Sequence, residues 1–248
     1  MTPVLLAIGA LAAACVQATT GIGFALVLSP IAFALLSPTG AIVAVTALGL
    51  ELNLLVLLGE RRRPRVAWRE LVPILLAAIP GSVGGVLLLR ALPKAALQVV
   101  VGVALIGAAL LLVRRTAVRP PPSGGRSMAG RLAVGFSTGV LGTSTGVSGP
   151  PQALWLARLN LTPAEVRDSL SASFLVLGVI AFVTLVPVLH RAHLTAAELL
   201  AGLACVVGGH AIGSRAFVRL NPDWFKPLLL AIIVSAGLAS IAAGAAGL

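Results

Sequence analysis

The sequence predicts an all-α polytopic integral membrane protein, a helical bundle composed of two related halves. Of its 248 residues, 58% are hydrophobic and 10% are charged, and the mean hydropathy is +1.08. Apolar runs of about 20 residues follow one another along the chain, which is the length that a membrane helix needs. Strand-like alternation is absent, and backbone groups inside a bilayer must be satisfied within a helix. A soluble fold of this length could not bury so much apolar surface.

Six apolar runs have the length of one membrane crossing. At 1.5 Å per residue, each can span the roughly 30 Å of hydrocarbon in a bilayer. The expected crossings are residues 41–59, 71–89, 95–113, 169–189, 195–213 and 227–248.

Two further segments, 4–36 and 132–157, do not fit a single crossing, because a polar, glycine-rich patch interrupts each near its middle. The first would be roughly 50 Å long as one helix, which is too long for one crossing. We expect each segment to be a broken helix or a hairpin that returns to its own side of the membrane.

The distribution of positive charge favours the hairpins. If each segment crosses once, the 18 Lys and Arg residues divide 11 against 7, whereas two hairpins divide them 15 against 3. Basic residues gather on the cytoplasmic side of membrane proteins. Each half then makes three full crossings and the second half is inverted, as in many secondary transporters. A first segment that crosses twice remains an alternative.

Short matches between the halves suggest an internal duplication. We expect a first repeat at 1–113, a basic, Pro- and Gly-rich cytoplasmic linker at 114–131, and a second repeat at 132–248. The matches have offsets of 125 and then 128 residues, and they pair 20–23 with 145–148, 36–38 with 161–163, 70–71 with 198–199, and Gly81 and Gly85 with Gly209 and Gly213.

The two polar interruptions are the predicted substrate site. Pro150 and Pro151 cannot donate backbone hydrogen bonds, and the glycines permit sharp turns. A helix that begins at such a break presents N–H groups, which favour an anion. Close helix packing by small residues is the alternative explanation. The candidate substrate-binding residues are Gln17, Thr19, Thr20, Gly21, Gly23, Thr143, Ser144, Thr145, Gly146, Ser148, Gly149 and Gln152.

Polar residues within the apolar runs are candidates for proton coupling. Glu51 lies in the middle of a run with Asn53 beside it, and a carboxyl group at that depth is costly unless it has a function. His210 could relay a proton. A neutral, hydrogen-bonded Glu and a structural His are the alternatives.

Residues 142–155 (GTSTGVSGPPQALW) and 20–30 (TGIGFALVLSP) resemble the glycine-rich motifs of the TauE/SafE family of sulfite exporter-like membrane proteins. Phe24 and Ser148 stand where many members continue a run of glycines. The resemblance implies that the chain moves sulfite, sulfonates or related sulfur-containing organic anions across the cell membrane.

The predicted function is therefore a multi-pass secondary transporter of the plasma membrane that carries a small anion by alternating access. The alternatives are a membrane-embedded enzyme, for which no convergent catalytic groups are evident, and a passive anion channel. The expected partners are the anion and the lipid bilayer, with a proton or another cation left open as the coupling ion. A homo-oligomer is also left open.

We expect no nucleic acid among the partners. The formal charge of +11 comes from basic residues between apolar runs, without interleaved aromatic residues. Cys15 and Cys205 have no metal-ligand spacing, so neither a metal nor a cofactor is expected.

Overall fold

The computed structural model describes residues 2–59, 63–114, 127–156, 159, 161–217 and 222–247, and among them every regular element is helical. This confirms the predicted all-α bundle. The helices are α1 (Thr2–Thr20), α2 (Phe24–Leu35), α3 (Pro38–Gly59), α4 (Trp68–Ala91), α5 (Lys94–Arg114), α6 (Met128–Thr145), α7 (Gly149–Leu156), α8 (Pro163–Leu185), the 3₁₀ helix η1 (Val186–Arg191), α9 (Ala196–Phe217) and α10 (Pro222–Ala246).

Over their described residues, all six expected crossings coincide with helices to within one residue at either end. Four described segments are long and apolar enough to cross a membrane: α3, α4, Glu165–Arg191 in α8 and η1, and Ala196–Arg215 in α9. The other two crossings were expected on α5 and α10, whose described apolar stretches are shorter. These helices make the chain an integral membrane protein.

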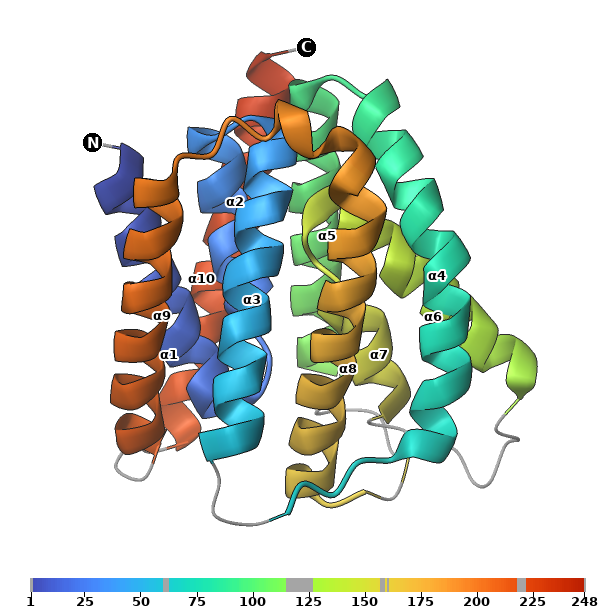
Figure 1. Cartoon of the computed structure of the whole chain (residues 1–248). Coiled ribbons are helices and arrows are strands. Elements are labelled where there is room, and N and C mark those ends of the chain that lie inside the picture. Colours follow the sequence, from blue (N-terminus) through green and yellow to red (C-terminus); the bar gives the residue numbers. More distant parts are fainter. Residues whose placement is uncertain are drawn as a thin grey trace.

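The two interrupted segments are helical hairpins in the structure. A Cβ placed on Gly9 of α1 would lie 3.1 Å from Ile31 of α2, and one on Gly130 of α6 would lie 2.8 Å from the Trp155 ring of α7. Both ends of the first hairpin (α1 and α2) lie toward one end of the bundle, and both ends of the second hairpin (α6 and α7) lie toward the other (Figure 1). Each hairpin therefore points its break into the bundle.

The helix contacts of one half have counterparts in the other. If each helix is matched with the one five places later, the extensive α4–α6 contact corresponds to α1–α9, while the α3–α8 and α5–α10 contacts each correspond to themselves. A two-fold relation between the halves would produce this pattern. Figure 1 shows α3, α4 and α5 running opposite to α8, α9 and α10 respectively, and the duplication itself stays a prediction.

Individual glycines at the α4–α6 and α1–α9 contacts show the same correspondence. A Cβ on Gly81 would collide with the carbonyl group of Phe136, and a Cβ on Gly209 would collide with that of Leu11. Phe136 and Leu11 are 125 residues apart and the glycines are 128 apart, which are the two offsets found in the sequence. Both helix pairs approach so closely because these positions lack side chains.

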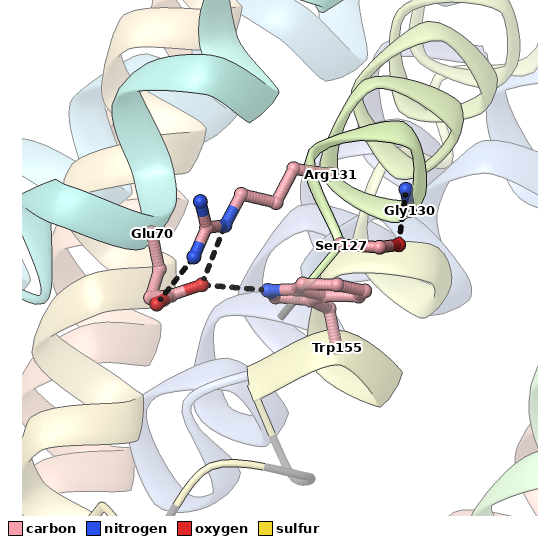
Figure 2. A network of polar contacts seen from close by, with 5 residues as sticks. All are labelled: Glu70, Ser127, Gly130, Arg131 and Trp155. Carbon is pink, nitrogen blue, oxygen red and sulfur yellow. Dashed lines mark hydrogen bonds and ion pairs between the residues drawn. The ribbon is translucent and has the colours of Figure 1, made fainter. Parts of the chain in front are cut away.

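A polar network holds the second hairpin against α4 (Figure 2). Glu70, in the first turn of α4, accepts hydrogen bonds from Arg131 Nε at 2.9 Å, Arg131 Nη2 at 3.0 Å and Trp155 Nε1 at 3.2 Å. Since Arg131 belongs to α6 and Trp155 to α7, one buried carboxylate binds both arms of the hairpin. This network lies near the end of the bundle where the second hairpin begins.

Candidate functional site

The two helix breaks begin with the same backbone turn. Gly21 and Gly146 adopt left-handed conformations, with φ of 75° and 77°, which disfavour any residue with a side chain. Gly21 N–H donates to the carbonyl oxygen of Gln17 at 2.8 Å, and Gly146 N–H donates to that of Gly142 at 3.0 Å. Each glycine therefore ends one helix and turns the chain toward the next.

The breaks meet inside the bundle. The Ser29 hydroxyl of α2 donates a hydrogen bond to the carbonyl oxygen of Thr145, at the end of α6. A Cβ on Gly149 would lie 3.6 Å from Ile22, which belongs to the other break. Two segments about 125 residues apart in sequence thus form one junction.

A cavity of about 80 Å³ lies at this junction, between the two breaks and helices α3, α4, α6 and α8. That volume can hold roughly five water molecules or one small anion. The residues lining it are Gln17, Ile22, Gly23, Phe24, Ala25, Leu26, Val45, Thr46, Gly49, Leu50, Asn53, Ser82, Thr138, Gly139, Gly142, Thr143, Gly146, Val147, Ser148, Gly149, Phe174, Leu177, Gly178 and Ala181.

A chain of amide hydrogen bonds fixes one wall of the cavity. The Asn53 side chain donates to the Gly49 carbonyl oxygen at 2.7 Å and accepts from Gln17 Nε2 at 2.9 Å. The Gln17 side-chain oxygen in turn accepts from the backbone N–H of Phe24 at 3.2 Å. Gln17 and Asn53 therefore hold the first break against α3, and the first N–H group of α2 is already occupied.

Hydroxyl groups on α4 and α6 form another wall of the cavity, the hydroxyl wall. Thr143 donates to the carbonyl oxygen of Ser82 at 2.8 Å or to that of Gly139 at 3.0 Å. Thr138 is completely buried, and its hydroxyl has no hydrogen-bond partner. A buried hydroxyl without a partner costs free energy, so a polar ligand in the cavity would relieve that cost.

The two helices that begin at the breaks, α2 and α7, contribute unequal numbers of backbone N–H donors to the cavity. Helix geometry leaves the N–H groups of Ala25 and Leu26 without partners within α2, and both residues line the cavity. In α7, Pro150 and Pro151 have no N–H group to offer. The positive end of α2 is thus the stronger of the two backbone contributions.

About half of the predicted substrate-binding residues line the cavity: Gln17, Gly23, Thr143, Gly146, Ser148 and Gly149. Ser144 and Thr145 do not line it, and their hydroxyls donate to the carbonyl oxygens of Val140 and Leu141, one turn earlier in α6. Gln152 instead accepts from Ser173 at 2.7 Å, and Gly21 lies against Arg167. The side chains of Thr19 and Thr20 lie outside the described part of the structure.

The three candidates for proton coupling are placed differently. Asn53 lines the cavity, whereas Glu51 and His210 are not among its lining residues. Glu51 Oε2 and His210 Nδ1 are both buried without a hydrogen-bond partner. Their proposed part in coupling stays a prediction.

The sequence analysis did not select Thr46, Ser82 or Thr138, all of which line the cavity. Thr46 and Ser82 are single hydroxyl residues within apolar runs, and Thr138 follows Ser137 ahead of the glycine-rich motif. Such residues are common in membrane helices. Ser82 directly follows Gly81, whose repeat match marked the α4–α6 contact, so that match was the available signal.

Membrane helices around a cavity that is lined in part by polar groups, with two helix breaks meeting at that cavity, are the arrangement of a membrane transporter. The chain belongs to the sulfite exporter TauE/SafE family, which it matches over residues 5–240. This confirms the resemblance found in the two motifs and identifies the protein as a member of a transporter family. No curated protein and no solved structure matches the chain.

Proposed function

We propose that this protein is a multi-pass carrier of the plasma membrane that moves a small sulfur-containing anion, sulfite or a sulfonate, by alternating access. The observation that carries the proposal is the cavity at the junction of the two breaks, where the buried Thr138 hydroxyl lacks a partner. Family membership supports the class of substrate.

In this proposal the anion is held by neutral groups. The Thr138 hydroxyl and the N–H groups of Ala25 and Leu26 donate to its oxygens, and the positive end of α2 stabilises its charge. The Gln17–Asn53 pair keeps the first break in position while the anion is bound. These contacts require no metal and no covalent step.

In this proposal, the matching helix contacts of the two halves allow the conformational change that transport needs. In inverted-repeat carriers the two halves exchange conformations around a central site. The α4–α6 and α1–α9 pairs are equivalent here, so each could take the conformation of the other and open the cavity toward the opposite side. The second half is inverted relative to the first in this proposal.

The distribution of the described basic residues supports an orientation of the bundle in the membrane. One end of the bundle contains the α3–α4 connection with Arg63 and Arg65, the starts of α4, α6 and α8 with Arg69, Arg131 and Arg167, and the end of α9 with Arg215 (Figure 1). The other end contains the end of α4 with Arg90, the start of α5 with Lys94 and the end of η1 with Arg191. The end with more positive charge is proposed to be cytoplasmic.

Flux into proteoliposomes tests the proposal. Labelled sulfite and ethanesulfonate should enter with saturable kinetics, and comparing flux with and without a proton gradient shows whether protons are coupled. Thr138→Val keeps the shape of the side chain and removes its hydroxyl. It should raise the half-saturating concentration about tenfold or more, because a hydrogen bond to a charged group is lost.

Thr184→Val is the matched control, since that hydroxyl bonds to Ala181 within α8 and Thr184 does not line the cavity. It should transport like the unmodified protein. Absence of flux for both anions would refute the substrate assignment, and a steady conductance without saturation would indicate a channel instead of a carrier.

A further inference from the structure

We infer that the cavity selects singly charged anions and rejects doubly charged anions of similar size. This inference rests on the proposed function, because it concerns the charge of the ligand in the same cavity. It follows from the lining residues, the helix ends and the unpartnered hydroxyl of Thr138.

No described residue that lines the cavity is ionisable. Transfer of an ion from water into such a site is costly, and the cost rises with the square of the charge. Proteins that bind doubly charged oxyanions tightly commonly surround them with Arg or Lys side chains. This cavity has only dipoles to offer.

The available dipoles suit one negative charge. A helix N-terminus acts as roughly half an elementary positive charge, so the ends of α2 and α7 together supply about one at most. Pro150 and Pro151 remove two donors from α7, which lowers its share in direct hydrogen bonding. A second negative charge would therefore be left without compensation.

The unpartnered hydroxyl indicates where the charged group binds. Thr138 is fully buried and unpartnered, and Ser82 is also nearly fully buried on the same wall. The lining also includes the apolar side chains of Phe24, Leu50 and Phe174. A short alkyl sulfonate, or sulfite carrying one proton, presents oxygens to the hydroxyl wall and has no second charge.

Ligand-induced thermal stabilisation of the detergent-solubilised protein tests this inference separately from transport. Ethanesulfonate carries one negative charge and sulfate carries two across the usable pH range. Methylphosphonate gains its second charge on going from mildly acidic to alkaline pH without changing shape. We expect stabilisation by ethanesulfonate at both pH values and by methylphosphonate only at acidic pH, with sulfate binding at least about tenfold more weakly.

Ethanesulfonate controls for any effect of pH on the protein itself. Thr138→Val should lose the stabilisation and Thr184→Val should keep it; if Thr138→Val does not fold, the smaller change Ser82→Ala at the same wall replaces it. Equal stabilisation by sulfate and ethanesulfonate, or none by either, would overturn the inference. Selective stabilisation without flux in proteoliposomes would leave the monoanion site standing and refute transport.

Discussion

Gly21 and Gly146 end the first helix of each hairpin, and the cavity lies directly beyond them. The neighbours of Gly146 are close, since a Cβ there would lie 3.1 Å from Val45. Both its backbone conformation and its surroundings thus require glycine. The matching TG pairs at 20–21 and 145–146 were visible in the sequence, but their left-handed conformations were not.

Gly146→Ala should lower the free energy of unfolding by about 1–2 kcal/mol, because a left-handed conformation is unfavourable for an L-residue. Gly107→Ala is the control, since nothing lies within 4 Å of a Cβ at that helical position. It should stabilise α5 by about 0.5–1 kcal/mol. Thermal denaturation in detergent measures both, and equal effects of the same sign would show that backbone conformation is not decisive at Gly146.

Hydroxyl residues show where prediction from the sequence stops. Thr143, Ser144 and Thr145 are consecutive, yet only Thr143 lines the cavity. Helix rotation decides this, and the rotation depends on the packing of α6 against α4. Only that packing shows that Thr138 lines the cavity, because Thr138 lies outside the glycine-rich motif.

At the scale of elements, segment length and charge distribution correctly favoured two interrupted hairpins and six long helices. Such patterns do not reveal the contacts of individual side chains, as the matched acidic residues Glu70 and Glu198 show. Glu70 binds Arg131 and Trp155 across three helices, whereas Glu198 caps its own helix by accepting from the backbone N–H of Thr195 at 2.9 Å. The two positions that the repeat offset pairs thus make different contacts.

Arg131→Met should lower the free energy of unfolding by about 3 kcal/mol, because it leaves the buried Glu70 carboxylate without its charged partner. Combining it with Glu70→Gln should cost less than the sum of the two single changes, since the partners are coupled. Arg90→Gln, at an exposed arginine in the last turn of α4, is the control and should have little effect. Strict additivity in denaturation experiments would argue against the network as the anchor of the second hairpin.

For the whole molecule, hydropathy alone identified a membrane bundle, whereas the internal repeat stays a prediction. The two breaks were expected to meet at one site, but the particular contact between Ser29 and Thr145 could not be predicted, because it joins residues from opposite halves. Orientation in the membrane is the remaining prediction at this scale.

Single cysteines introduced at Arg63, Arg90 and Arg191 can decide the orientation after Cys15 and Cys205 are replaced by alanine. All three arginines are exposed. With hairpins, a membrane-impermeant maleimide should label positions 90 and 191 from one side and position 63 from the other. Labelling of positions 63 and 191 from the same side would instead show that the interrupted segments cross once.

The residues of the hydroxyl wall have no hydroxyl residues at the positions that the repeat offsets pair with them. At the repeat offsets, Thr138 and Thr143 correspond to Ala13 and Ala18, and Ser82 corresponds to His210. Both alanines are buried and have no polar side-chain atom. If the proposed carrier binds its anion at this wall, the matched positions offer no second set of hydroxyl groups, and we expect one anion to move in each conformational cycle.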